Sequence, residues 1–387
     1  MRKTNKPRTI LLCPGPVLLS KAVRRAVGRA NMGHREADFS AVLVESTEML
    51  RPIVGIDETY EVALLTGSGT AANETIISSL GSRGPLLVIS NGEFGERLFA
   101  VATLHNPEVD CLQFAWQAPI DLGAVSEMLR ARAYSMVALV HHETSTGMLN
   151  PVAEITALAH RHGAIVSVDA ISSIGAEEIR ATEWGVDILV GASGKALSAM
   201  PGVGILVVRS ALLDTLTEPS AAGHYLDLYN HFYYMRNFTQ TPNTPAVHVF
   251  ISLHASLREI TALGVERFQE TIRQRALYTR RQVSRMGLTY ASYDGANSNV
   301  ITCIELPEHL TFSQLARQFK RKGIVVYNGK GALKDRIFQV GHIGALRATD
   351  TPYAVRQLRK MVRSPAVAKV AGPVIGEPQA AAVNGVA

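Results

Sequence analysis

The chain has 387 residues, of which 47% are hydrophobic, and it carries a formal net charge of +6 at pH 7. This length allows two domains with an extensive shared core, and the modest charge is compatible with anionic small-molecule substrates. No apolar run approaches the ~18–20 residues needed to cross a bilayer, so neither a membrane-spanning helix nor a membrane partner is expected.

Residues 1–16 form an N-terminal segment before the first predicted domain. The segment begins with basic residues, but Pro14-Gly15-Pro16 cuts its apolar stretch short, so no signal peptide is expected. The three cysteines, Cys13, Cys111 and Cys303, have neither an even count nor a metal-ligand spacing. This usage indicates reduced thiols and a cytoplasmic location.

We expect residues 17–250 to form a large domain, because short apolar runs alternate there with amphipathic stretches of helix length. The runs predict buried strands at residues 62–65, 86–90, 136–140, 165–168, 188–190 and 204–208. Strands that are buried on both faces and separated by helices indicate an α/β fold with a mostly parallel sheet. Ligands of such sheets bind at the carboxyl ends of the strands, where all the candidate site residues fall.

The first candidate site is the segment Thr66-Gly-Ser-Gly-Thr70, which follows a strand and opens a helix. Glycines let the backbone approach an anion, the helix N-terminus offers free N–H groups, and Ser68 and Thr70 add hydroxyl donors. The segment predicts an anion site, and a plain strand-to-helix turn is the alternative.

Two more strands end in loops with distinctive side chains. Phe94 lies between two glycines, where it can stack on a flat ring or cap the core. The hydroxyl run Thr144-Ser-Thr146 can donate to a cofactor oxygen. The preceding pair, His141 and His142, predicts no metal site, because adjacent strand residues point to opposite sides and no second ligand cluster follows.

Lys195 and Asp169 carry the most specific chemistry. Lys195 follows a buried strand in the sequence Ser193-Gly-Lys195, where burial and nearby cations can lower an amine's pKa and make it nucleophilic. Alone, a lysine after a strand is usually a solvated loop residue. Asp169, however, ends the preceding strand, and small residues follow it. A carboxylate for a pyridinium nitrogen and a lysine for an aldehyde are the two groups that pyridoxal 5′-phosphate (PLP) requires.

We expect residues 251–364 to form a smaller α+β domain and residues 365–387 a disordered tail. A helical pattern runs from Val247 to Met286, with an interruption at Gly264. Its basic residues predict a solvated face and no nucleic-acid partner, since no aromatic platform accompanies them. These residues are Arg273, Arg275, Arg280, Arg281 and Arg285. Strands at 300–304, 324–327 and 337–340 and helices at 311–322 and 351–362 complete the domain.

Together these motifs resemble the class V aminotransferases of PLP fold type I. The resemblance rests on Cys13-Pro-Gly-Pro16, Gly67-Ser-Gly-Thr70, Asn91-Gly-Glu-Phe94, His142-Glu-Thr-Ser-Thr-Gly147, Val168-Asp169, Ser193-Gly-Lys195 and Thr241-Pro-Asn-Thr244. It extends from about Thr9 to Met361. Within the class, the chain is most similar to 2-aminoethylphosphonate–pyruvate and alanine–glyoxylate (serine–pyruvate) transaminases.

The resemblance implies a homodimeric PLP enzyme that moves an amino group between a small donor and a 2-oxo acid or aldehyde. A phosphonate or other anionic amine is a reasonable donor. Lys195 is the implied catalytic residue, which bonds to the cofactor and moves the substrate's proton. The implied cofactor-binding residues are Ser68, Gly69, Thr70, Phe94, Thr144, Asp169, Ser193, Lys195 and, from the partner subunit, Thr241 and Thr244.

One position departs from the family. The relatives carry an arginine that grips the substrate's carboxylate, and Gln339 stands in its place. A neutral glutamine amide cannot form the charged, bidentate pair that an arginine forms with a carboxylate, which costs about 1.5–3 kcal/mol of binding free energy. Either another arginine compensates, for which Arg35 is better placed than Arg336, or one substrate is not an ordinary α-amino acid. Gln339 and Arg35 are the candidate substrate-binding residues.

Two alternative functions stay open. All PLP reactions begin from the same covalent complex, so a PLP-dependent lyase that eliminates or decarboxylates is one. A PLP-binding regulator is the other, but such proteins usually carry an added DNA-binding domain, which we do not expect here. Desulfuration is not expected either, because Cys303 lies in an apolar strand pattern and not on a mobile loop.

Overall fold

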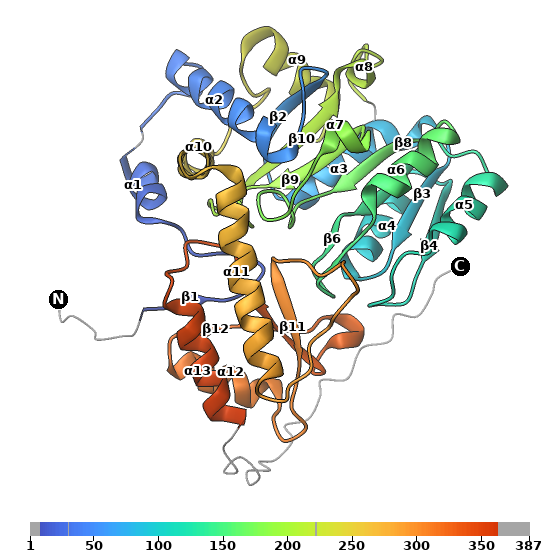
Figure 1. Cartoon of the computed structure of the whole chain (residues 1–387). Helices are drawn as coiled ribbons and strands as arrows, with labels where there is room; N and C mark the ends of the chain where they lie inside the picture. The colour runs from blue at the N-terminus through green and yellow to red at the C-terminus, as the bar shows by residue number, and fades with distance from the viewer. Residues whose placement is uncertain (1–7, 30, 221–222, 363–387) are drawn as a thin grey trace, which may run out of the picture.

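The computed structural model describes residues 8–29, 31–220 and 223–362, so the expected tail at 365–387 lies outside the described residues. The described chain forms a large domain around a seven-stranded sheet and a smaller domain below it in Figure 1. The long helix α11 (Val265–Ser284) runs from one domain to the other.

The large sheet has the strand order β2-β10-β9-β8-β5-β3-β4. Its strands are β2 (Tyr60–Thr66), β3 (Leu86–Ser90), β4 (Val109–Gln113), β5 (Met136–Val140), β8 (Ile165–Asp169), β9 (Ile188–Ala192) and β10 (Val203–Arg209). Strand β10 runs in the opposite direction to the other six strands, so its pairs with β2 and β9 are antiparallel and all other pairs in the sheet are parallel. The predicted α/β fold with a mostly parallel sheet is confirmed. Strand β4 was not predicted, because its half-buried residues lack a continuous apolar run.

Successive side chains of each strand enter different hydrophobic clusters on the two faces of the sheet. In β3, for example, Leu87 and Ile89 pack on one face, and Leu86 and Val88 on the other. The first face is covered by α2 (Ala37–Val54), α5 (Leu122–Ala131), α6 (Val152–Arg161) and α10 (Val247–Leu263). The second is covered by α3 (Gly69–Leu80), α4 (Glu93–His105) and α9 (Leu228–Phe238). Burial of both faces explains why the strands are continuous apolar runs.

Shorter elements connect this framework. They are α1 (Lys21–Arg29), α7 (Ala181–Trp184), α8 (Ser210–Leu213), the 3-10 helix η1 (Gly81–Arg83) and the two-stranded pair β6 (His142–Glu143) and β7 (Met148–Leu149).

The small domain is an antiparallel sheet with helices against it. Its strands, in the order β11-β14-β13, are β11 (Ile301–Glu305), β14 (Ile337–Gly341) and β13 (Tyr327–Asn328). Helices α12 (Phe312–Arg321) and α13 (Asp350–Val362) pack on it, and Thr311 and Gln314 close α12 with a capping box. The N-terminal segment enters this core, because β1 (Ile10–Leu11) pairs in parallel with β12 (Ile324–Val325).

The expected domain division after residue 250 falls inside α10. Phe250, Leu253 and Leu257 of this helix pack in the large domain, whereas Val283 of α11 packs in the small one. Gly264, with a φ of +90°, separates the two helices at the predicted interruption. Val265 and Phe268 at the start of α11 still pack against the large-domain cluster, so α11 passes from one core to the other beyond Gly264.

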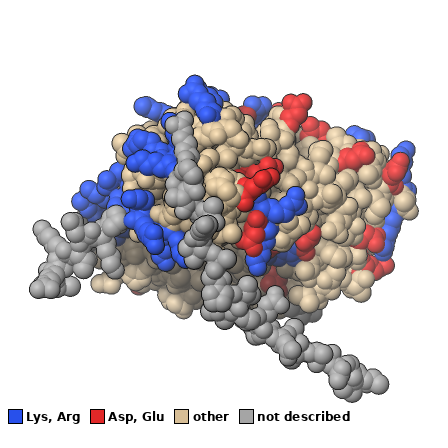
Figure 2. Space-filling view, turned by 90° about the horizontal axis from the view of Figure 1, so that it is seen from below, with Lys and Arg blue, Asp and Glu red and all other residues tan. Residues whose placement is uncertain are grey.

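The basic group on α11 is less solvated than the pattern suggested. Arg275 is half-buried and donates to the carbonyl of Leu346 at 2.9 Å, and Arg280 donates to the carbonyl of Ser298. Seen from the small-domain end, Lys and Arg gather on one side and mix with Asp and Glu on the other (Figure 2). Within the described ranges, no helix is long and apolar enough to cross a membrane, and no cluster of His, Cys, Asp or Glu could hold a metal.

Candidate active site

A cavity of about 310 Å³ lies at the carboxyl ends of β5, β8 and β9. This is the edge at which ligands of parallel sheets bind. Gly15 and Pro16 of the N-terminal segment form part of its wall. The cavity brings together Ser68, Gly69, Thr70, Phe94, Thr144, Asp169 and Lys195 from the predicted set.

Lys195 lies in a tight turn after β9. A Cβ on Gly194 would lie 2.8 Å from Cα of Pro201, so this position requires glycine. Gly15 requires glycine because its φ is +145°, and a Cβ there would lie 2.9 Å from Nζ of Lys195. Burial, followed by the charge of Lys330, lowers the pKa of Lys195, while Asp169 acts in the opposite direction. The unprotonated amine is the nucleophilic form, so this environment suits covalent chemistry.

Ser193 stabilises this turn through hydrogen bonds to its backbone. Its hydroxyl donates to the carbonyl of Met200 at 2.6 Å and accepts from the amide of Val203 at 3.1 Å. Ser193 is buried and is not among the cavity-lining residues. Its contacts therefore fit a positioning residue for Lys195.

Asp169 is the buried carboxylate at the end of β8. Its Oδ2 accepts from Nδ2 of Asn73 at 2.7 Å, and its Oδ1 accepts from the amide of Ile171 at 2.9 Å. Burial is the main influence on Asp169 and raises its pKa, while these hydrogen bonds act to lower it. A cationic partner in the cavity would stabilise the ionised form further.

The N-terminus of α3 forms another wall. Ser68 caps the helix by accepting from the amide of Ala71 at 3.4 Å, and Thr70 follows in the first turn. A Cβ on Gly69 would lie 2.4 Å from Cδ1 of Ile171, so the start of α3 packs closely on this side chain of the loop after β8. Free N–H groups and the helix dipole make this wall suitable for a phosphate.

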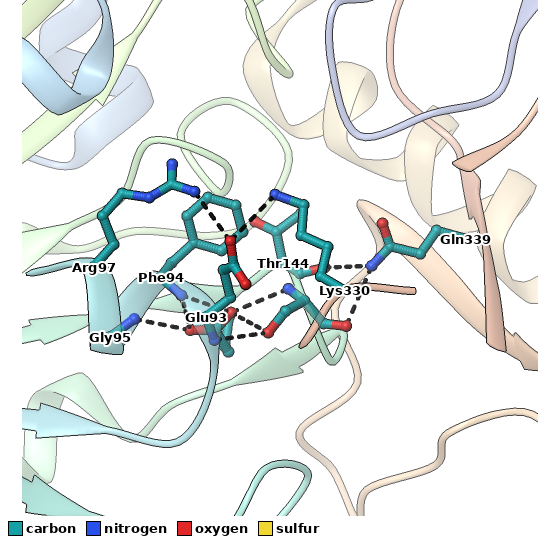
Figure 3. A network of polar contacts seen from close by, with 9 residues as sticks. Glu93, Phe94, Gly95, Arg97, Thr144, Lys330 and Gln339 are labelled. Carbon is teal, nitrogen blue, oxygen red and sulfur yellow. Dashed lines mark hydrogen bonds and ion pairs between the residues drawn. The ribbon is translucent and has the colours of Figure 1, made fainter. Parts of the chain in front are cut away.

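Phe94 is held by a buried carboxylate that the sequence did not reveal. Glu143 accepts from the amides of Phe94 and Gly95, each at 3.1 Å, at the start of α4 (Figure 3). Ser145 donates to Glu143 from its amide at 3.0 Å and from its hydroxyl at 2.5 Å. Burial raises the pKa of Glu143, and these donors act in the opposite direction. The Phe94 loop is thereby fixed to the Thr144 loop.

Thr144 links the cavity to the small domain. Its hydroxyl donates to Ser172 at 2.7 Å, and Ser172 in turn lies 3.0 Å from Nδ1 of His142. The carbonyl of Thr144 accepts from Nε2 of Gln339 at 2.8 Å (Figure 3). Gln339 is buried and is not among the cavity-lining residues, so its amide serves the protein backbone in this structure.

Arg35, Thr241 and Thr244 lie outside the lining of this chain's own cavity. They lie together, because Arg35 donates to the carbonyls of Thr241 at 2.8 Å and Pro242 at 3.3 Å. Thr241 is buried and Thr244 exposed. One loop, anchored by Arg35, therefore carries both threonines.

The sequence did not indicate several residues of the site, among them Asn73, Arg97, Glu143 and Lys330. Asn73 lies one turn into α3, where a polar residue on a buried helix face was the available signal. Glu143 lies within a quoted motif, but its burial could not be read from it. Lys330 acts from the other domain, and no local pattern indicates that contact.

Comparison with known proteins adds independent support. Residues 18–354 match the family described as Aminotransferase class-V. The chain is 32% identical over 359 residues to the 2-aminoethylphosphonate–pyruvate transaminase of Pseudomonas aeruginosa, covering 92% of this chain and 96% of that protein. It is 31% identical over 347 residues to an uncharacterized aminotransferase of Methanocaldococcus jannaschii, covering 88% and 89%. The solved alanine–glyoxylate aminotransferase of Nostoc sp. shares the fold, with a TM-score of 0.86 at 24% identity over 94% of this chain and 97% of that one.

Proposed function

This chain belongs to the class V aminotransferases, which depend on PLP, and we propose that it takes an amino group from a small amine bearing an acidic group. The acceptor would be a 2-oxo acid or an aldehyde. The expected family, fold type and cofactor are confirmed by the comparisons. The observation that carries the proposal is that Lys195 and Asp169 line a single cavity.

The cavity residues fit PLP on structural grounds. Its volume of about 310 Å³ lies within the range of small-ligand sites. Asp169 offers a buried carboxylate, Lys195 a half-buried amine of lowered pKa, and the α3 N-terminus an anion site around Gly69. These are the three features that a pyridine nitrogen, an aldehyde and a phosphate require.

The protein's own contribution follows from these positions. When bound, PLP supplies an aldehyde that bonds to amines and a ring that accepts electrons from the substrate carbon. Lys195 Nζ would take the proton from the substrate's α-carbon, and its lowered pKa leaves the amine unprotonated closer to neutral pH. Asp169 would hold the ring nitrogen, Phe94 would stack on the ring, and Thr144 would donate near its oxygen. Ser68, Gly69 and Thr70 would hold the phosphate.

We further propose that the enzyme is a cytoplasmic homodimer with shared active sites. Thr241 and Thr244 do not line the cavity of their own chain, which fits a role in the partner's cavity. Arg35 holds their loop and would approach the partner's cavity with it. Cys13, Cys111 and Cys303 are all unpaired, as is usual in a reducing compartment.

The visible spectrum of the purified holoenzyme tests the proposed reaction. We expect the absorption band of bound PLP to disappear when 2-aminoethylphosphonate, taurine, alanine or serine acts as donor, and to return on adding a 2-oxo acid. The Lys195→Ala variant serves as the control that lacks the covalent link. Loss of the amine to a carbonyl product without the recoverable change in the band would identify a lyase instead.

A further inference from the structure

Two cations approach the ring of Phe94 from different domains. The guanidinium carbon of Arg97, on α4, lies 4.9 Å from the ring centroid. The ammonium of Lys330, on the small-domain loop before the 3-10 helix η2 (Gly331–Leu333), lies 4.7 Å from it. Cation–π attraction favours both placements.

A carboxylate occupies the space between these cations. Oε1 of Glu93 lies 3.2 Å from Nη2 of Arg97 and 3.9 Å from Nζ of Lys330. Figure 3 shows the Glu93 carboxylate between the ends of the two basic side chains, beside the Phe94 ring. An acidic group therefore already sits where the two positive charges converge.

The two ion pairs of Glu93, with Arg97 and with Lys330, are exposed enough for a ligand to replace them. The side chains of Arg97, Glu93 and Lys330 are 42%, 29% and 40% exposed, so solvent and small ligands can reach them. Ion pairs of such exposure contribute little to stability. A ligand oxyanion can displace the Glu93 carboxylate, accept two hydrogen bonds from the guanidinium of Arg97 and pair with the ammonium of Lys330.

The two cations also act near the cavity, although only Arg97 is one of its lining residues. Arg97 belongs to the cavity lining, and the charge of Lys330 is felt at Lys195, whose pKa it helps to lower. The other candidates are committed elsewhere, since Gln339 donates to the Thr144 carbonyl and Arg35 to the Thr241 loop. Arg336 is exposed on the small domain.

We propose that Arg97 and Lys330 together bind the acidic group of the amino substrate, and that Glu93 occupies their site until the substrate arrives. The inference rests on the proposed transaminase function and names its substrate class. The substrate is a primary amine that carries an oxyanion, and a dianionic phosphonate matches two cations better than a monoanionic sulfonate. Recognition of the acid by these residues would replace the arginine that is missing at Gln339.

The test compares donors and variants of the holoenzyme. Single-turnover loss of the PLP band, measured against donor concentration, yields half-saturation values for 2-aminoethylphosphonate, taurine and the uncharged-tail analogue propylamine. We expect Lys330→Gln and Arg97→Gln to raise the half-saturation value for the phosphonate, relative to that for propylamine, by about tenfold or more. Lys330→Arg should restore most of the preference, and Glu93→Gln should lower the value for the phosphonate.

A matched control is Lys334→Gln, which removes the same charge from an exposed position at the other end of η2. An unchanged preference in both Lys330→Gln and Arg97→Gln would overturn the proposal. If no amine reacts with the wild type, the proposed transaminase function fails, and calorimetry with the unreactive anion ethylphosphonate then decides the present inference. Weaker binding in Lys330→Gln than in Lys334→Gln would sustain it, and equal binding would overturn it.

Discussion

Nε2 of Gln339 lies 2.8 Å from the carbonyl oxygen of Thr144 and 3.2 Å from that of Ser145. The side chain is 1% exposed, so these bonds are made away from water. Gln339 belongs to the small domain and Thr144 to the cavity wall of the large one. Gln339, which the sequence resemblance predicts to bind substrate, therefore joins the two domains.

Replacing Gln339 by leucine should destabilise the protein by about 1–3 kcal/mol, because two buried carbonyls lose their donor. Urea unfolding monitored by tryptophan fluorescence would measure the loss. The half-saturation concentration for amine donors should change little. The reverse pattern, an altered donor affinity with unchanged stability, would instead show that Gln339 touches the substrate.

Removing the charge of Lys330 should raise the pKa of Lys195. Burial, the ammonium of Lys330 and the charge of Arg97 all lower that pKa from its ordinary value of 10.5, so Lys330→Gln removes one of these causes. The pH dependence of Lys195 acetylation in the PLP-free protein, followed by mass spectrometry, would report it. We expect the midpoint to move to higher pH in Lys330→Gln and to stay in place in Lys334→Gln.

His141 should make stability fall on acidification. Burial lowers the pKa of His141 from 6.5 to about 4, so the unfolded chain takes up a proton before the folded one does. The contribution of neutral His141 to the free energy of unfolding is fully present above pH 6.5. It is lost between pH 6.5 and 4, at up to about 1.4 kcal/mol per pH unit. Unfolding free energies of wild type and His141→Asn should converge over this range. Curves that stay parallel would contradict a neutral, buried His141.

Adding a methyl group at Gly15 should disturb Lys195. A Cβ there would lie 2.7 Å from Cδ of Lys195, and the φ of +145° disfavours any other residue. Gly15→Ala should therefore weaken the PLP band, whereas Gly163→Ala should leave it intact. Gly163 also has a positive φ, of +76°, but open space around it, so it controls for the backbone strain of about 1 kcal/mol. Equal bands in the two variants would count against the close packing of Gly15 on Lys195.

Mixed dimers should reveal whether the active sites are shared. Lys195→Ala and Thr244→Glu are each expected to be inactive, the second because its carboxylate would repel the partner's phosphate. Unfolding and refolding the two together should restore about a quarter of the wild-type activity, since one site in each heterodimer has both native residues. No recovery from mixing would indicate that Thr244 does not serve a partner's site.

The sequence revealed the parts of the site that follow from local chemistry. Asp169 and Lys195 could be found because each follows a buried strand, and carboxyl ends of parallel strands share one edge. Strand periodicity likewise located β2, β3, β5, β8 and β9, since burial on both faces leaves a continuous apolar run.

Features that depend on distant contacts could not be read in this way. The antiparallel direction of β10 has no signature in a run of apolar residues. Glu143 is buried because the N-terminus of α4 packs on it, and Lys330 meets Glu93 only when the two domains pack. Phe250 belongs to the large domain because α10 lies against α2, a partner far away in the sequence.

The pairing of β1 with β12 bears on how the protein is made. Ile10 and Leu11 leave the ribosome long before their partners Ile324 and Val325. Domains generally fold in the order of synthesis, so the large sheet can form before β1 can pair with β12. Gly15 and Pro16, which follow it, belong to the cavity wall. The nascent chain can therefore bury most of its core before it has a complete catalytic pocket.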